Sequence, residues 1–130
     1  MAESERYRRG REKLEEIHGE HGREVVQALE DVAPELARYI FEFAFGDIYR
    51  REGLHLRDRQ IATIAALTAQ GNAQPQLKAH IRGGLNVGLT RSEIMEVIVQ
   101  MAVYAGFPAA MNGAAAAREA FREADAGTEG

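Results

Sequence analysis

Apolar residues recur at the spacing of an α-helix along almost the whole chain, and Gly or Pro residues separate the runs. The clearest run places Ile94, Val97, Ile98 and Met101 on one helix face. The sequence holds 22 Ala against seven Val, eight Ile and four Thr, a balance that favours helix over strand. We therefore predict an all-α protein of six or seven helices without a sheet.

No linker, repeat or low-complexity segment divides the chain, so we predict one domain over residues 1–130. Residues 1–20 are charged on nearly all sides. They fit a helix or arm that docks through a narrow apolar stripe, Tyr7, Leu14 and Ile17, and breaks near Gly19. Residues 125–130 are predicted to form a frayed tail.

Between these ends, local signals mark the helix boundaries. Asp58 is placed to cap a helix whose residues 61–67 leave almost no polar arc, so this helix should be enclosed by neighbours. Pro75 fits the first turn of the next helix, and Gly88 its end. Thr90 and Glu93 form a capping box. The last helix is expected over residues 109–124, where an Ala-rich stretch lets another helix approach closely.

Composition excludes several classes of function. The net charge is −4 and the sequence pI is near 5.6, so a nucleic-acid partner is not expected. Cysteine is absent, which removes disulfides, thiolate metal sites and thiol redox chemistry. The charged N-terminus has no apolar stretch long enough for a signal peptide or a membrane span, so we expect a cytoplasmic protein without a membrane partner.

Four histidines are the groups that titrate near neutral pH. His18 and His21 form an HxxH pair, but two ligands without a third nearby fit a solvated helix end better than a metal site. His55 lies in a connector with nothing local to activate it. No metal site is predicted.

His80 differs from the other three because helical geometry places it on the border of the buried stripe of its helix, about 60° from Leu77 and about 40° from Gly84. A half-buried imidazole there can transfer protons. Gly83 and Gly84, one turn on, leave space for a ligand or a neighbouring helix. The alternative is a histidine with a purely structural role. A catalytic role requires that the ring face an enclosed cavity.

Other polar residues lie beside apolar faces. Arg59 and Gln60 fall in the first turn of the predicted buried helix, where free amides and the helix dipole favour an anion. Glu96, Gln100 and Tyr104 form a row at i, i+4 and i+8 on the capped helix. Either set can line a cavity, but a solvated Gln and an ordinary exposed face remain the alternatives.

Residues 54–117 resemble the carboxymuconolactone decarboxylase family, and residues 25–57 look like the N-terminal part of the same family. The matching elements are Arg59, Gln76, Leu77, His80, Gly88, Thr90, Glu93, Glu96 and residues 104–108 (YAGFP). The resemblance implies the helical alkylhydroperoxidase D-like fold, commonly assembled as a hexamer formed as a trimer of dimers.

The resemblance also implies an activity. Members that give the family its name decarboxylate γ-carboxymuconolactone in the β-ketoadipate pathway of aromatic breakdown, without a metal or an organic cofactor. The peroxidase branch instead uses a CxxC motif ahead of the histidine. Ala73 and Gln76 occupy those two positions here, so thiol peroxidase activity is excluded. Many relatives carry an acidic residue where this chain has Gln60, and a Gln cannot exchange protons.

We therefore expect a cofactor-free decarboxylase of a small carboxylated lactone. His80 is the predicted proton donor, and the predicted substrate-binding residues are Arg59, Gln60, Glu96 and Tyr104. The expected partners are a small acidic substrate and further copies of the chain. The alternative is a non-catalytic helical oligomer that binds a small acidic or apolar metabolite, a reading that Gln60 and the missing cysteines favour.

Overall fold

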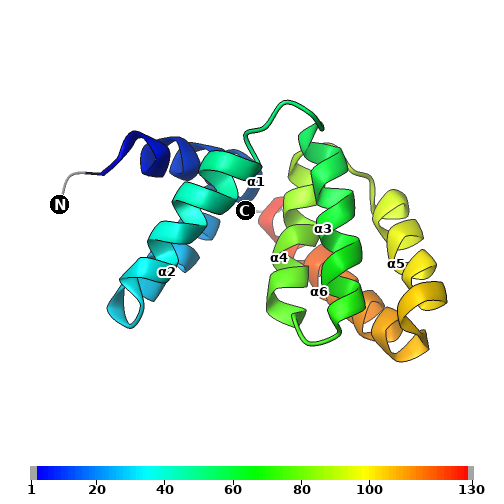
Figure 1. Cartoon of the computed structure of the whole chain (residues 1–130). Coiled ribbons are helices and arrows are strands. Elements are labelled where there is room, and N and C mark those ends of the chain that lie inside the picture. The colour runs from blue at the N-terminus through cyan, green and yellow to red at the C-terminus, as the bar shows by residue number, and fades with distance from the viewer. Residues whose placement is uncertain (1–2, 129–130) are drawn as a thin grey trace. The chain divides into compact units, whose positions relative to one another are not determined.

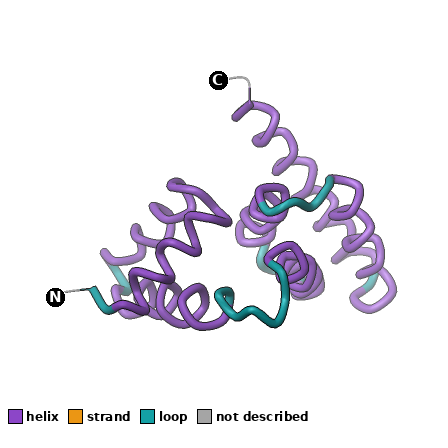
Figure 2. Tube along the Cα trace, turned by 90° about the horizontal axis from the view of Figure 1, so that it is seen from above, coloured by secondary structure: helices purple, strands orange, loops and turns teal. Residues whose placement is uncertain are grey.

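A computed structural model describes residues 3–128, and every regular element in that range is helical (Figures 1 and 2). The elements in chain order are α1 (Glu5–Gln27), a 3₁₀ turn η1 (Ala28–Asp31), α2 (Pro34–Tyr39), a π-helix η2 (Ile40–Ile48), α3 (Leu56–Gln70), α4 (Gln74–Asn86), α5 (Arg91–Ala105) and α6 (Phe107–Thr128). The prediction of an all-α protein is confirmed. The six α-helices of the described range lie within the predicted number.

The chain divides into two compact units, residues 1–55 and residues 56–130. The first unit contains α1, α2 and η2, and the second contains α3 to α6. That both units make one domain stays a prediction.

In the first unit, α1 packs along η2. The predicted stripe is confirmed, because Leu14 and Ile17 are buried. The predicted break at Gly19 is also found, since that residue has φ 74° and separates two helical segments of α1. A second helical segment follows Gly19 and runs to Gln27.

Gly10 sets how closely α1 approaches η2. A Cβ atom built at Gly10 would lie 1.6 Å from the backbone oxygen of Phe41. Gly46 of η2 makes the matching approach, because its Cβ would lie 2.7 Å from the backbone oxygen of Arg6. Both glycines therefore let backbone meet backbone where any side chain would separate the helices.

The π-helix η2 was not predicted. Its nine residues carry the cluster of aromatic side chains, of which Phe41 and Phe45 are buried and Phe43 is 58% exposed. The ring of Phe41 lies 4.8 Å from that of Tyr7, and the ring of Phe45 stacks on Tyr49. Phe41 and Phe45 thus pack inside the first unit, whereas Phe43 lies at its surface.

In the second unit, α3 packs against α4, α5 and α6. In Figure 1, α3 and α4 run side by side. The buried core is formed by Ile64, Leu77, Ile81, Leu89, Ile94, Ile98, Ala116, Ala117 and Ala120. The Ala-rich stretch of α6 therefore lies inside this unit, where small side chains allow close packing. Close approach is clearest at Gly113, whose Cβ would lie 3.0 Å from Thr68 Cγ2.

The boundary signals of α4 and α5 are confirmed. Pro75 lies in the first turn of α4. Gly88 follows its end with φ 108°. Thr90 and Glu93 form the full capping box, in which each side chain accepts from the other residue's backbone N–H. Local sequence signals alone therefore predict where α4 ends and α5 begins.

The structure differs from the predictions for α3 and α6. α3 begins at Leu56, so Asp58 lies inside its first turn and does not precede the helix. The helix is not enclosed on all sides, because Ala62 and Ala66 are exposed. α6 starts earlier than predicted and stays helical through residues 125–128. Residues 129–130 of the predicted tail lie outside the described range.

Within residues 3–128, no helix is long and apolar enough to cross a membrane.

Candidate functional site

Two of the predicted site residues meet in the second unit. Gln60 Oε1 of α3 and His80 Nδ1 of α4 lie 2.9 Å apart, within hydrogen-bonding distance. An amide oxygen only accepts, so the ring nitrogen donates in this arrangement. The two residues are twenty positions apart in the sequence, and the antiparallel pairing of α3 with α4 across a short turn brings them together.

Their environments differ. Gln60 is fully buried on the core side of α3, in line with Ile64 and Thr68. His80 is half-buried, as its position on the border of the apolar stripe predicts. The pair therefore joins a fixed, dry amide to an imidazole with partial access to the surface.

The other end of the Gln60 amide is unusual. Its Nε2 is buried and donates no hydrogen bond to any described residue. Buried polar atoms without a partner are rare in proteins, and each calls for an explanation such as a ligand group or a bound water. The buried hydroxyl of Thr68, two turns further along α3, does have a partner, because it donates to the backbone oxygen of Ile64 at 2.7 Å.

Gly84 holds α3 and α4 at the spacing that the pair requires. Its Cβ would lie 2.9 Å from Leu89 Cδ1, 3.4 Å from Ile64 Cδ1 and 3.8 Å from Gln60 Cβ. The space beside Gly84, which we expected to hold a ligand or a neighbouring helix, is thus filled by side chains of the protein's own core.

The remaining predicted site residues are Arg59 on α3 and Glu96 and Tyr104 on α5. Arg59 is half-buried in the first turn of α3. Glu96 is exposed on α5, and Tyr104 is 79% exposed. Near Tyr104, the exposed face of α5 and the start of α6 also carry large apolar side chains, namely Val99, Val103, Phe107 and Met111.

Sequence reasoning missed Arg57, which ties the start of α3 to the start of α5. Its guanidinium donates to the carboxylate of Glu93. The backbone N–H of Thr90 donates to the same carboxylate, and this bond, followed by Arg57, holds the pKa of Glu93 below its usual value. The capping box was visible in the sequence, but its ion-pair partner, 36 residues away, carried no local signal.

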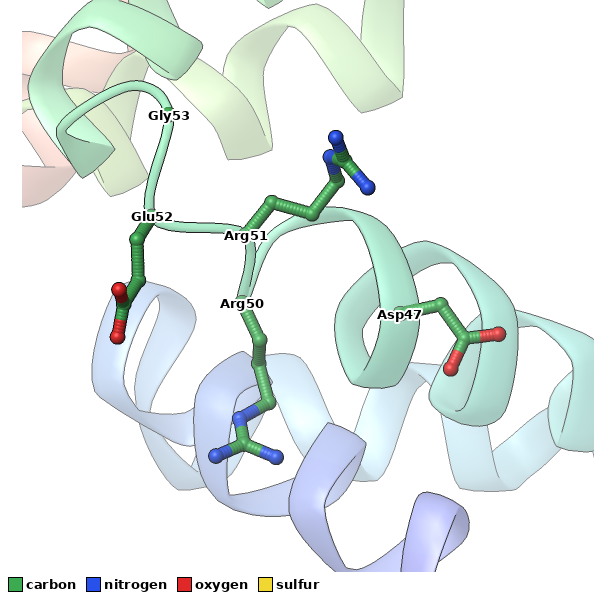
Figure 3. A pocket seen from close by; sticks show the side chains of 5 residues that line it. All are labelled: Asp47, Arg50, Arg51, Glu52 and Gly53. Carbon is green, nitrogen blue, oxygen red and sulfur yellow. The ribbon is translucent and has the colours of Figure 1, made fainter.

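Two hollows lie in the first unit. The larger is lined by Asp47, Arg50, Arg51, Glu52 and Gly53. Figure 3 shows that the side chains of Arg50 and Arg51 point in opposite directions. Asp47 is held by Arg6 at 2.7 Å. The hollow is therefore an open depression whose cations do not converge on a ligand.

The second hollow lies over the charged face of α1 and is lined by Arg9, Glu12, Lys13, Glu16 and Arg50. Lys13 there pairs with Glu16 at 2.6 Å. Neither hollow is lined by His80 or by another predicted site residue, so neither is the enclosed cavity that a catalytic role of His80 requires. Within the described range, no group of three or more His, Cys, Asp or Glu side chains is arranged to hold a metal ion.

Comparisons with known proteins bear on the second unit most directly. The sequence model of the carboxymuconolactone decarboxylase family matches residues 34–119, which include both Gln60 and His80. This range is about two thirds of the chain.

Three curated proteins illustrate the similarity. The chain is 34% identical to a 4-carboxymuconolactone decarboxylase of Acinetobacter baylyi, over 95% of this chain and 92% of that protein. It is 37% identical to an uncharacterized 15.0 kDa protein of Paracoccus denitrificans, over 77% of this chain and 75% of that protein. It is 38% identical to a nitrosuccinic acid decarboxylase of Metarhizium robertsii, over 53% of this chain and 48% of that protein.

Proposed function

The chain belongs to the carboxymuconolactone decarboxylase family, and on this premise we propose that it removes CO2 from a small carboxylated lactone of the γ-carboxymuconolactone type, with His80 as the proton donor. The broader class, a carboxy-lyase, rests on two relatives that are named decarboxylases of different acids. The observation that carries the residue assignment is the contact of the half-buried His80 ring with the buried Gln60 amide.

Decarboxylation of such a substrate requires an electron sink and a proton donor. When the carboxylate leaves as CO2, the electron pair of the broken C–C bond remains on carbon. In a lactone whose carbonyl is conjugated with that carbon, the pair spreads onto the carbonyl oxygen, and a nitro group can accept it in the same way. Such substrates supply their own electron sink, which supports a reaction without a cofactor. A proton must then reach carbon.

His80 is the group that we assign to this proton transfer. General acid catalysis of this kind contributes a factor of about 10² to 10⁴ in rate. Arg59, in the first turn of α3, is proposed to bind a substrate carboxylate through its forked guanidinium. The unpartnered Gln60 Nε2 supports a contact with a substrate oxygen, because such an oxygen would complete its hydrogen bonding.

Glu96 and Tyr104 are retained as proposed substrate-binding residues. Both lie on the exposed side of α5, where apolar side chains such as Val103 and Phe107 also face outward, at 77% and 74% exposure. Such a face is suited to contact with another copy of the chain. We therefore include homo-oligomerisation, as a hexamer formed from three dimers, in the proposal; the mass of the protein in solution tests it.

The proposed function is tested by CO2 release from γ-carboxymuconolactone by the purified protein in the presence of a chelator. His80→Gln should reduce kcat at least about 100-fold. The substitution keeps a donor in reach of Gln60, so the thermal midpoint should change little. The matched control is His55→Gln, the same change at an exposed connector histidine, which should retain full activity.

Two results would contradict the proposal. Full turnover by His80→Gln would remove the assigned proton donor. Binding of the lactone by the unaltered protein, seen as a thermal shift without CO2 release, would favour the non-catalytic alternative. That alternative has one observation on its side, because the Gln60 amide beside His80 cannot relay a proton.

A further inference from the structure

The Gln60–His80 contact also bears on which ring nitrogen handles the proton. We infer that Gln60 is a positioning residue that keeps a proton on His80 Nδ1, so that Nε2 is the nitrogen at which the transferable proton arrives and leaves. The inference rests on the proposed role of His80 as the proton donor. It goes beyond that role by assigning the tautomer of the ring and the residue that sets it.

The first support is the geometry. Gln60 Oε1 lies 2.9 Å from Nδ1, and a carbonyl oxygen can only accept a hydrogen bond. Gln60 is fully buried, so water does not compete for its oxygen. In a neutral imidazole one nitrogen carries the proton and the other accepts, and the hydrogen bond made by one nitrogen decides the state of the other.

The second support is the packing around Gln60. Gly84 lets α4 approach α3 so closely that its hypothetical Cβ would lie 3.8 Å from Gln60 Cβ and 3.4 Å from Ile64 Cδ1. Ile64 is itself fully buried. Gln60 is therefore packed from the side of the partner helix, where its carbonyl oxygen contacts the imidazole.

The third support concerns the proton cycle. Nδ1–H can donate to the Gln60 oxygen whether the ring is neutral or cationic, so this bond survives both states. A proton taken from water at Nε2 gives the imidazolium. Transfer of that proton from Nε2 to the substrate carbon, after CO2 has left, restores the neutral Nδ1–H ring. The ring thus gains one proton and gives up one proton in each turnover.

An amide turned end for end would have the opposite effect. Its NH2 group would then donate to Nδ1, which would have to be unprotonated, and the neutral ring would carry its proton on Nε2. The two arrangements therefore predict different tautomers of His80, which can be measured directly without any substrate.

The experiment is ¹⁵N NMR of the full chain labelled at histidine, recorded at a pH where the His80 ring is neutral. The protonated and unprotonated nitrogens of a neutral imidazole have well-separated shifts. The His80 signals are assigned by their absence from His80→Gln. In the unaltered protein we expect Nδ1 to be protonated and Nε2 to be unprotonated.

Gln60→Leu should move the ring toward the Nε2–H form, which a histidine side chain favours by itself in water. The matched control is Thr68→Val, which also removes a buried polar group from α3 but leaves the Gln60 contact in place. This control should keep the Nδ1–H form. If Gln60→Leu does not fold, the tautomer of the unaltered protein still decides.

An Nε2–H ring in the unaltered protein would overturn the inference, and so would the same tautomer in Gln60→Leu as in the unaltered protein. Neither readout depends on turnover. A protein that shows the Nδ1–H tautomer but releases no CO2 would contradict the proposed function alone. A protein that releases CO2 with an Nε2–H ring would contradict only the role of Gln60.

Discussion

Replacing Gly10 by Ala tests the closest contact in the first unit. The Cβ atom of the new residue would lie 1.6 Å from the backbone oxygen of Phe41. Carbon and carbonyl oxygen normally approach to about 3.3 Å, so α1 would have to move away from η2 by about 1.7 Å. The obstacle is backbone, which cannot rotate aside as a side chain can.

The size of the effect follows from two opposing contributions. Ala stabilises a helix interior by about 1 kcal/mol relative to Gly. Overpacking costs about 1–3 kcal/mol and occasionally more, and the upper end applies because the displacement would also loosen Leu14, Ile17 and Phe41, all buried. We expect a net loss of about 2 kcal/mol or more in the free energy of unfolding.

Urea unfolding measures this loss. With a slope of about 1–3 kcal/mol per molar urea, a loss of about 2 kcal/mol lowers the midpoint by about 0.7–2 M. Tyrosine fluorescence is a suitable probe, because Tyr7, Tyr39 and Tyr49 lie in the first unit and only Tyr104 lies in the second.

The matched control is Gly53→Ala. Its Cβ would meet no atom within 4 Å, so its midpoint should correspond to a change within about 0.5 kcal/mol. If Gly10→Ala were as stable as the unaltered chain, or more stable through its helix propensity, the close crossing of α1 and η2 would be refuted.

Two further predictions concern the second unit. The Thr90 N–H and Arg57 hold the pKa of the Glu93 carboxylate below its usual value. The chain should therefore lose stability as the pH falls below neutral and through this folded-state pKa. Thermal unfolding measured against pH should show this loss, and Glu93→Gln should make the pH dependence flatter. Gln60→Glu should raise the pKa of His80, because a nearby carboxylate favours the imidazolium. The fall in decarboxylation rate on the alkaline side of the pH–rate profile should then move to higher pH. An unchanged pH–rate profile would contradict the contact between positions 60 and 80.

The parts of the fold that the sequence predicted are those set by neighbouring residues. Pro75, Gly88 and the Thr90–Glu93 box each act within one or two turns, so their spacing alone locates the ends of α4 and α5. The π-helix over Ile40–Ile48 could not be found in this way. Its apolar residues fit an ordinary helical repeat, and no residue type within it marks a wider turn.

The candidate site was predictable in part for the same reason. The border position of His80 follows from helical geometry, and its half-burial agrees with that expectation. Its contact with Gln60 depends on how far α4 approaches α3, which is set by Gly84 and by the side chains that fill the space around it. No spacing rule in a single sequence encodes that distance. The role of His80 in catalysis stays a prediction.

The buried amide of Gln60 also limits how this protein can change over time. Thr68 finds its acceptor within its own helix, so its hydrogen bond does not depend on a side chain of another helix. Gln60 finds its partner on a different helix, so a change at position 60 or position 80 to a residue that cannot make this hydrogen bond leaves the other side chain without its partner. Mutational drift should therefore alter these two positions together, and a designer who wants a new reaction from this scaffold should randomise them as a pair.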